Sequence, residues 1–243
     1  MHAFAVIPAR FESVRYPGKP LLTIKGESMI SRVYRQVMKA ESIHSALIAT
    51  DDERIHTHCL NANIPVVMTD RNHKSGTDRV AEAIQNIETD IVVNIQGDEP
   101  FILPEYVDLL VDCFENPEVN ISTLVAPCRL EDMENEHIVK VVVDRHGKAL
   151  YFSRTAIPFN RGPIKKPYPL CHLGMYAFRK YSILAITQLA HGLLESIESL
   201  EQLRWLEEGW AIHTTEVSNA PISIDTPEDL EKALAWMEDN DWP

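Results

Sequence analysis

Short apolar runs alternate with amphipathic stretches through the first half of the chain. Each run has the length of a β-strand and is rich in valine and isoleucine, while the stretches between them repeat apolar residues at helical spacing. This strand–helix order predicts a doubly wound α/β fold with a mainly parallel sheet. Such sheets bind ligands at the carboxyl ends of their strands. The predicted strands are Ala3–Ile7, Ala46–Ala49, Val66–Met68, Ile91–Ile95 and Ile121–Val125, and the predicted helices lie near Met29–Ala40, Asp52–Asn61, Gly76–Ile87 and Pro104–Phe114.

A different pattern occupies the second half of the chain. Residues 139–143 and 149–152 are largely apolar and flank a polar turn that contains Gly147, which predicts a β-hairpin. A helical pattern covers Ile197–Glu208. We therefore expect the 243 residues to form one domain with an inserted lobe at about residues 128–218.

The formal net charge of -13 limits the partners that the chain can have. An acidic surface argues against binding to nucleic acids, which requires a basic footprint. No apolar run approaches the roughly 20 residues that span a bilayer. The chain opens on the strand-like AFAVI, without the basic lead and long apolar stretch of a secretory signal. We expect no nucleic-acid partner, no membrane association and a cytoplasmic location.

The cysteines are four in number and lie far apart in the sequence. They are Cys59, Cys113, Cys128 and Cys171, and they include no C-x-x-C pair. This spacing indicates neither a zinc site nor a disulfide framework. We therefore expect reduced, partly buried thiols.

Three cations gather in the loop after the first predicted strand. Arg10, Arg15 and Lys19 fall within ten residues, with only Glu12 opposing them. In an acidic protein such a loop predicts a pocket for phosphate groups, which arginine and lysine bind well. A surface loop with ordinary charges is the alternative. The chain has no Walker loop and no G-x-G-x-x-G segment, so it is neither a P-loop NTPase nor a protein with an NAD-binding fingerprint.

Two aspartates after apolar runs are candidate metal ligands. Asp98 follows the predicted strand Ile91–Ile95, and carboxylate oxygens are the ligands that Mg²⁺ prefers. The alternative for Asp98 is a turn aspartate close to Pro100. Asp225 follows a second, shorter apolar run and precedes Thr226, which can cap a final helix. A helix-capping role is the alternative for Asp225.

Other polar residues complete the set of candidates. Ser75 and Gly76 open a predicted helix, where free backbone N–H groups can contact a base or phosphate; plain capping is the alternative. In the lobe each polar residue, taken singly, is more typical of a structural or solvated role. No Ser/His/Asp or Cys/His order indicates a nucleophile with its base, and packing is a commoner role for a lone histidine than general-base catalysis. The candidates in the lobe are Arg154, His172, Tyr176, Glu201 and Gln202.

Eight short segments, spread over nearly the whole chain, form a combination far more specific than any single motif. They are IPAR-x₄-R-x-PGKPL at 7–21, TDDERI at 50–55, SGTDR at 75–79, NIQGDEP at 94–100, YFSR at 151–154, HLGMYAFR at 172–179, LEQLR at 200–204 and DTPEDL at 225–230. In this order they resemble the 3-deoxy-manno-octulosonate (Kdo) cytidylyltransferases, which make CMP-Kdo for lipopolysaccharide. The resemblance implies a fold similar to other nucleotide-sugar synthetases and a homodimer formed through the lobe.

The resemblance also implies a reaction and a role for each matching residue. The anomeric hydroxyl of an acidic eight-carbon sugar would attack the α-phosphorus of CTP, and pyrophosphate would leave. Cationic side chains and Mg²⁺ would offset the charge on the phosphate oxygens. The implied catalytic residues are Lys19, Arg10 and Asp98; the nucleotide-binding residues are Arg10, Arg15, Lys19, Ser75, Gly76 and Gln96; the sugar-binding residues are Arg154, His172, Tyr176, Glu201 and Gln202; and the Mg²⁺ ligands are Asp98 and Asp225.

One position departs from the family's pattern. A basic residue usually precedes the His-x-Gly-x-Tyr segment, and here that position is Cys171. The loss of a cation beside the sugar would suit a sugar with a positive group, such as 8-amino-3,8-dideoxy-manno-octulosonate (Kdo8N), which one branch of the family activates. Neutral drift at a packing position is the alternative.

Two rival functions remain. One is a different nucleotide-sugar synthetase, such as a cytidylyltransferase for sialic acid or an isoprenoid precursor, against which the YFSR and LEQLR segments argue. The other is a nucleotide-binding relative without turnover, against which the intact Arg10, Lys19, Asp98 and Asp225 argue.

Overall fold

The computed structural model describes residues 1–12, 16–162 and 169–240, which form two units. Unit 1 comprises Met1–Asp108 and the chain from Pro221 onward, and unit 2 comprises Leu109–Ala220. Unit 2 starts earlier in the sequence than the expected lobe, because it includes a strand that pairs within it. In the part of the chain that the structure describes, no helix is long and apolar enough to cross a membrane.

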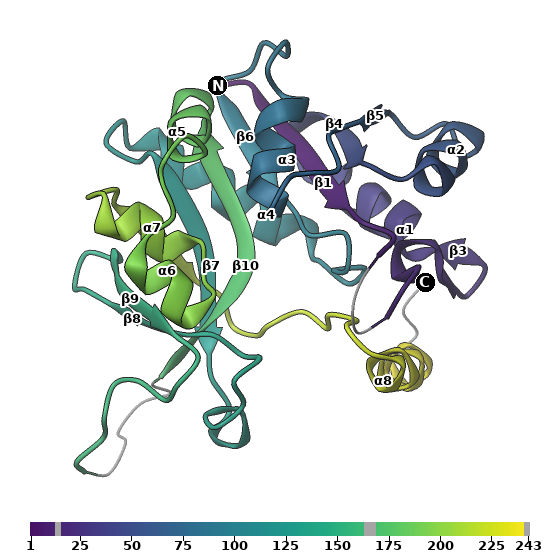
Figure 1. Cartoon of the computed structure of the whole chain (residues 1–243). Helices are drawn as coiled ribbons and strands as arrows, with labels where there is room; N and C mark the ends of the chain where they lie inside the picture. The colour runs from purple at the N-terminus through teal and green to yellow at the C-terminus, as the bar shows by residue number, and fades with distance from the viewer. Residues whose placement is uncertain (13–15, 163–168, 241–243) are drawn as a thin grey trace. The chain divides into compact units, whose positions relative to one another are not determined.

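The first apolar runs of the sequence form a parallel sheet in unit 1, with strand order β6-β1-β4-β5 (Figure 1). Every residue of β1 and β6 is buried, as is typical of parallel strands in an α/β fold. The predicted α/β fold class is therefore confirmed. The strands are β1 (Ala3–Ala9), β4 (Ile43–Thr50), β5 (Val66–Met68) and β6 (Ile91–Asn94), with a small hairpin of β2 (Thr23–Ile24) and β3 (Glu27–Ser28); the helices are η1 (Lys19–Leu21), α1 (Met29–Val37), α2 (Glu53–Asn61), α3 (Gly76–Ala83), α4 (Pro104–Asp112, which crosses into unit 2) and α8 (Pro227–Asp239).

Side-chain caps explain where four helices of unit 1 begin. In each case the side chain of a Ser, Asp or Thr accepts a hydrogen bond from a backbone N–H of the first turn, a group that has no partner inside the helix. Two of these ends are capping boxes, in which an aspartate also accepts a bond from the backbone of the capping residue. The caps are Ser28 for α1, Asp52 for α2, Ser75 for α3 and Thr226 for α8.

Helix α8 packs against an apolar cluster of unit 1. Its buried Met237 lies in one core with Ile24, Met29 and Phe101, and the rings of Phe101 and Trp236 meet edge to face at 5.6 Å. Burying a methionine side chain stabilises a fold by roughly 1.5–3 kcal/mol. This packing holds the start of α8, far along the sequence, next to the segment that follows β6.

Unit 2 contains both parallel and antiparallel strand pairs (Figure 1). Strand β7 pairs with β11 in parallel and with β10 antiparallel, and β8 pairs antiparallel with both β10 and β9. The predicted hairpin is the β8–β9 pair and is confirmed. The elements are η2 (Cys113–Glu115), β7 (Ile121–Pro127), η3 (Leu130–Asp132), β8 (Lys140–Val143), β9 (Ala149–Ser153), β10 (Leu170–Arg179), α5 (Lys180–Ile186), α6 (Leu193–Glu198), α7 (Gln202–Glu207) and β11 (Ile212–Glu216).

The single helix expected at Ile197–Glu208 is wrong. Ser199 adopts a left-handed backbone with φ 53°, which ends α6 and separates it from α7. The sequence carries no glycine at this position to indicate the break. The two short helices pack against each other within unit 2.

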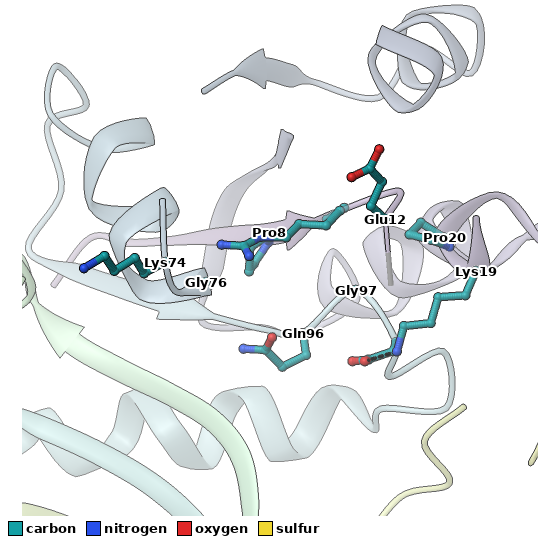
Figure 2. A pocket seen from close by; sticks show the side chains of 11 residues that line it. Pro8, Glu12, Lys19, Pro20, Lys74, Gly76, Gln96 and Gly97 are labelled. Carbon is teal, nitrogen blue, oxygen red and sulfur yellow. Dashed lines mark hydrogen bonds and ion pairs between the residues drawn. The ribbon is translucent and has the colours of Figure 1, made fainter. Parts of the chain in front are cut away.

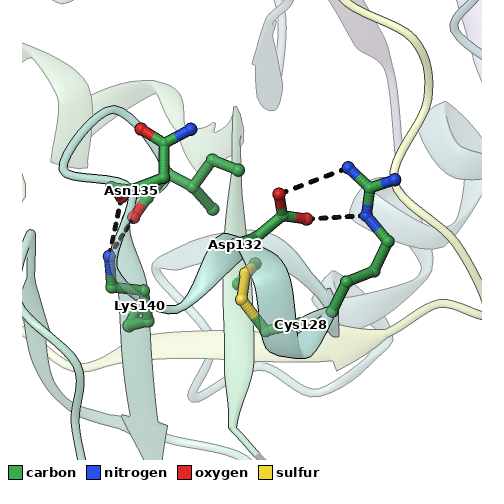
Figure 3. The surroundings of a disulfide bond; sticks show 7 residues. Cys128, Asp132, Asn135 and Lys140 are labelled. Atoms are coloured by element: carbon green, nitrogen blue, oxygen red, sulfur yellow. Dashed lines mark hydrogen bonds and ion pairs between the residues drawn. A yellow bond between two sulfur atoms is a disulfide. The ribbon is translucent and has the colours of Figure 1, made fainter.

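Two of the four cysteines form a disulfide, so the expectation of reduced thiols is wrong for Cys128 and Cys171 (Figure 3). The antiparallel pairing of β7 with β10 is the reason: the N–H of Cys128 donates to the carbonyl of Pro169 at 2.9 Å, which extends the ladder and leaves the two Cα atoms 5.0 Å apart. Cys59 and Cys113 are free, as expected.

Candidate active site

A pocket of about 300 Å³ lies at the carboxyl ends of β1 and β6 in unit 1 (Figure 2). The two loops that leave these strands form its walls. Gly97 allows their close approach, because a Cβ at this position would lie 3.1 Å from the carbonyl oxygen of Pro8. The lining residues are Pro8, Ala9, Arg10, Glu12, Lys19, Pro20, Lys74, Gly76, Gln96, Gly97 and Asp98. The pocket is therefore at the edge of the sheet where the sequence predicted the functional residues.

Lys19 joins the two predicted metal ligands. Its Nζ lies 2.5 Å from Asp98 Oδ2 and 2.9 Å from Asp225 Oδ1. The three side chains keep only 12%, 27% and 32% of their surface exposed. Burial lowers the pKa of Lys19, but the charges and hydrogen bonds of Asp98 and Asp225 outweigh burial and leave the pKa raised above 10.5. The lysine is therefore a cation held between two carboxylates.

Three separate segments place these groups. Lys19 begins the short helix η1 directly after Gly18, whose φ of +77° turns the chain at this point. Asp98 follows β6, and its backbone carbonyl accepts a hydrogen bond of 3.1 Å from the N–H of Ile224. Asp225 then precedes α8, and its N–H donates to Asp229 Oδ2 at 3.1 Å. Thr226 supplies the side-chain cap of α8, while the Asp225 carboxylate faces Lys19.

Glu99 is a residue of this region that sequence reasoning missed. Its Oε2 is buried and accepts no hydrogen bond from any residue that the structure describes. Burial, with the nearby charges of Asp98 and Asp225, raises the pKa of Glu99 well above 4.5, and Lys19 opposes this only in part. Its position beside Asp98 in the NIQGDEP segment was the available signal.

The basic side of the pocket involves Arg10 and the loop before α3. Arg10 Nη2 donates to the carbonyl of His73 at 2.6 Å, which ties the loop after β1 to that segment. Lys74 and Glu12 also line the pocket, and neither was predicted as a binding residue. Arg15, which was predicted, lies outside the described residues.

Ser75 and Gly76 form the N-terminus of α3 at the pocket. The Ser75 hydroxyl accepts from the N–H of Asp78 at 3.1 Å, so the capping alternative is correct for its side chain. Gly76 lines the pocket beside Gln96, whose Oε1 would lie 3.7 Å from a Cβ at position 76. Gln96 Nε2 donates to Asn94 Oδ1 at 3.3 Å.

In unit 2 the structure brings His172 and Tyr176 together in an aromatic cluster. The His172 ring lies 5.2 Å from the Tyr176 ring and 5.0 Å from Phe152, and its Nε2 is 3.0 Å from the hydroxyl of Thr123. Burial lowers the pKa of His172 to about 3, so the imidazole is neutral at neutral pH. The packed-histidine alternative therefore describes its surroundings well.

Tyr176 lies between this histidine and helix α7. Its hydroxyl is buried and has no hydrogen-bond partner among the described residues. Burial and the charge of Glu201 raise the pKa of Tyr176 well above 10. The ring of Trp205, 5.1 Å away, packs against it edge to face. A buried phenol without a partner is a group that a bound polar ligand could satisfy.

The remaining predicted sugar-binding residues lie at the start of α7 and after β9. Arg154 donates from Nε to the carbonyl of Glu198 at 2.8 Å, from Nη1 to the carbonyl of Glu136 at 2.9 Å and from Nη2 to the carbonyl of Ser199 at 3.2 Å. Arginine has five N–H donors, so these bonds hold the side chain without using all of them. Glu201 precedes α7 and Gln202 is buried within it.

Position 171 lies on the other side of β10 from His172. Successive side chains of a strand point to opposite faces, and Cys171 is bonded to Cys128. A side chain at position 171 therefore does not share the face of β10 on which His172 lies, and it could influence that face only indirectly.

Among the described residues, no three His, Cys, Asp or Glu side chains gather into a complete metal site. Asp98 and Asp225 are two carboxylates within reach of one cation. Mg²⁺ commonly takes one or two protein carboxylates and completes its shell with waters and substrate phosphates. The residues present therefore fit a magnesium ion that arrives with a nucleotide.

Comparison with known proteins agrees with this arrangement. The family model described as cytidylyltransferase matches residues 4–216. The chain is 45% identical to the 3-deoxy-manno-octulosonate cytidylyltransferase of Parabacteroides distasonis, with 98% of each chain covered, and 46% identical to that of Cytophaga hutchinsonii, with 93% and 94% covered.

Solved structures show the same relationship. The structure of CMP:2-keto-3-deoxy-manno-octonic acid synthetase complexed with CTP has a TM-score of 0.94 at 39% identity, and the match covers 99% of this chain and 100% of that one. The inositol-1-phosphate CTP transferase from T. maritima, at 15% identity and a TM-score of 0.70, covers 97% of this chain and 94% of its own and shares the fold alone.

Proposed function

The chain belongs to the 3-deoxy-manno-octulosonate cytidylyltransferase family, and we propose that it transfers the CMP moiety of CTP to Kdo. The anomeric hydroxyl of the sugar attacks the α-phosphorus and releases its proton to solvent, the bond from this phosphorus to the β-phosphate oxygen breaks, and pyrophosphate leaves. The products are CMP-Kdo, a precursor for lipopolysaccharide, and pyrophosphate. We place the reaction in the cytoplasm, where nucleoside triphosphates are available.

The observation that carries this proposal is the Lys19 site. Lys19 lines a pocket at the strand ends and is held by Asp98 and Asp225. The three side chains provide both signs of charge that a triphosphate and its metal need. Arg10 lies in the same pocket, and an arginine can bind phosphate oxygens with two N–H groups at once.

We propose Asp98 and Asp225 as the protein ligands of Mg²⁺. When bound, the metal supplies positive charge to the phosphate oxygens. Lys19 and Arg10 would hold the triphosphate and stabilise the charge that develops as pyrophosphate leaves. No protein nucleophile is needed, because the hydroxyl of the sugar attacks; positioning of the two substrates then provides much of the acceleration.

We place the sugar in unit 2. Arg154 has N–H donors left for a carboxylate, and within the described part of the chain the buried hydroxyl of Tyr176 has no partner. His172 would act as a neutral hydrogen-bonding group rather than as a general base, because its pKa of about 3 makes it a weak proton acceptor. Glu201 and Gln202 would contact the sugar from the start of α7.

The 8-amino analogue Kdo8N is the second candidate substrate. It rests on Cys171, which replaces the basic residue usual in the family. Because the Cys171 side chain is bonded to Cys128, a preference for the amine would have to act through β10. A Cys171→Arg variant tests this: an unchanged ratio of turnover with Kdo and with Kdo8N would count against the amino sugar.

We also propose a homodimer formed through unit 2. Leu150 on β9 and Leu193 and Ile197 on α6 are large apolar side chains that are 59%, 71% and 69% exposed in the monomer. Exposed apolar groups of this kind are typical of protein interfaces. Analytical ultracentrifugation of the wild type and of a Leu193→Glu/Ile197→Glu variant measures the association state, and a wild type that sediments as a monomer contradicts this part of the proposal.

One assay tests the reaction. Purified protein is supplied with Mg²⁺, each nucleoside triphosphate in turn, and a panel of Kdo, Kdo8N and sialic acid, and released pyrophosphate is measured. Release with CTP and an eight-carbon sugar, abolished by chelation with EDTA, is the expected result. Release with sialic acid alone would favour a different CMP-sugar synthetase, and no release with any sugar would favour a nucleotide-binding relative without turnover.

A further inference from the structure

Asn94 is a buried polar residue next to the nucleotide pocket. It is the last residue of β6, lies opposite Val6 of β1 and has only 1% of its surface exposed. Its Oδ1 accepts a hydrogen bond of 3.3 Å from Nε2 of Gln96, which lines the pocket. A side chain buried in a parallel sheet has little freedom to move, so this acceptor is held in place.

The bond couples the orientation of the Gln96 amide to that of Asn94. If the Gln96 amide turned over while Asn94 kept its orientation, its carbonyl oxygen would face Asn94 Oδ1, and two acceptors would repel each other without a hydrogen between them. In the orientation observed, Oε1 lies beside Gly76 (Figure 2). Figure 2 shows this oxygen directed toward the side of the pocket where Pro8 and Gly76 lie, both of which line the pocket. The pocket therefore presents a hydrogen-bond acceptor at a defined place.

We propose that Asn94 is a positioning residue for base selection, and that it orients Gln96 so that its carbonyl accepts from the exocyclic amine of cytosine. This inference rests on the proposed function, in which CTP occupies the pocket. Cytosine has an N4 amine that donates, whereas uracil has an O4 carbonyl at the same place that can only accept. Uracil would bring an acceptor against Gln96 Oε1, and a site built to hydrogen-bond one group rejects an analogue that lacks it.

The primary test is the ratio of kcat/KM for CTP to kcat/KM for UTP in an Asn94→Leu variant. Leucine has a similar size but no acceptor, so the Gln96 amide can turn over and offer its NH₂ group to uracil. The ratio should fall about tenfold or more, the effect of exchanging one hydrogen bond for an unmatched pair. General damage to the fold lowers turnover with both nucleotides, so it leaves the ratio unchanged.

Gln96→Glu provides the matched background. A glutamate carboxylate offers an acceptor oxygen whichever way it rotates, so its orientation does not depend on Asn94. Adding Asn94→Leu to Gln96→Glu should therefore leave the CTP-to-UTP ratio unchanged, although overall turnover is lower. Asn94→Asp, which keeps an acceptor, should retain the wild-type ratio. If Asn94→Leu does not fold, Asn94→Ala, which also lacks an acceptor, replaces it and should likewise lower the ratio.

Several results would overturn the inference. They are a wild-type ratio in folded Asn94→Leu or Asn94→Ala, a fall in the ratio that is as large when Asn94→Leu is added to Gln96→Glu as when it is added to the wild type, and a wild type that uses CTP and UTP alike. A wild type that releases no pyrophosphate with CTP and any sugar would instead contradict the proposed function.

Discussion

Replacing Asp98 by asparagine separates the chemistry of the Lys19 site from the stability of the fold. Asparagine has the shape of aspartate and keeps one carbonyl oxygen that can accept from Lys19 Nζ, now 2.5 Å from the carboxylate. It loses the negative charge that a magnesium ligand needs. We therefore expect a large loss of turnover with a small loss of stability.

The distances give the magnitudes. Two unit charges 2.5 Å apart attract by about 7 kcal/mol at an effective dielectric constant of about 20, and lost hydration offsets most of this. A hydrogen bond between charged groups has a net value of about 1.5–3 kcal/mol. Because Asp225 still pairs with Lys19 at 2.9 Å, the free energy of unfolding should fall by no more than about 2 kcal/mol. Turnover should fall about 1000-fold, or about 4 kcal/mol in activation free energy.

Both quantities can be measured on one preparation. Urea unfolding gives the stability, and pyrophosphate release from CTP and Kdo at saturating Mg²⁺ gives the turnover. Glu228→Gln is the matched control, because it removes an exposed carboxylate at the start of α8, and it should leave turnover unchanged. Turnover within tenfold of the wild type in Asp98→Asn, or in the fuller truncation Asp98→Ala, would refute the metal assignment. If turnover in Asp98→Asn falls only in proportion to the fraction of unfolded protein, the separation of the two effects is refuted.

Three further outcomes are expected. First, the pKa of His172 is about 3, against 6.5 for the free side chain, so only the unfolded chain takes up this proton as the pH falls from 6.5 to 3. The free energy of unfolding should therefore decrease through this window, by about 2 kcal/mol at pH 5. Urea unfolding at pH 7 and pH 5 measures the decrease, and the contribution of this site should be absent in His172→Gln. Second, the Cys128–Cys171 disulfide predicts two titratable thiols in the denatured, unreduced protein, and four thiols would contradict the disulfide. Replacing both cysteines by serine should lower the free energy of unfolding by about 2–4 kcal/mol, because the bond spans 43 residues of chain. Third, a methyl group at Gly97 would lie 3.1 Å from the carbonyl oxygen of Pro8, so Gly97→Ala should lower the free energy of unfolding by about 1–3 kcal/mol. It should also lower turnover, because it shifts the next residue, the proposed metal ligand Asp98. Unchanged stability and turnover would contradict the close approach of the two loops.

Local patterns predicted the elements of unit 1 well, because they depend on neighbours in the sequence. Apolar runs of strand length became β1, β4, β5 and β6, and the polar caps Ser75 and Thr226 mark where α3 and α8 begin. The break at Ser199 was missed, since a left-handed residue other than glycine leaves no clear mark in sequence.

The site could be predicted only in part. The position of Arg10, Lys19 and Asp98 after predicted strands follows from the rule that ligands bind at strand ends. The motifs also pointed to Asp225, but only packing explains its place. Helix α8 buries its apolar face on unit 1, and this contact brings Asp225 within 2.9 Å of Lys19, a residue early in the chain.

By itself, the sequence determined the kinds of element, the charges available at the strand ends and the order of motifs that relates the chain to the cytidylyltransferases. These properties depend on residue type and local spacing. Tertiary structure alone decided which distant groups meet: the pairing of Cys128 with Cys171 and the carboxylates around Lys19. Such contacts depend on strand pairing and helix packing, which the free energy of the whole fold selects and no single segment encodes.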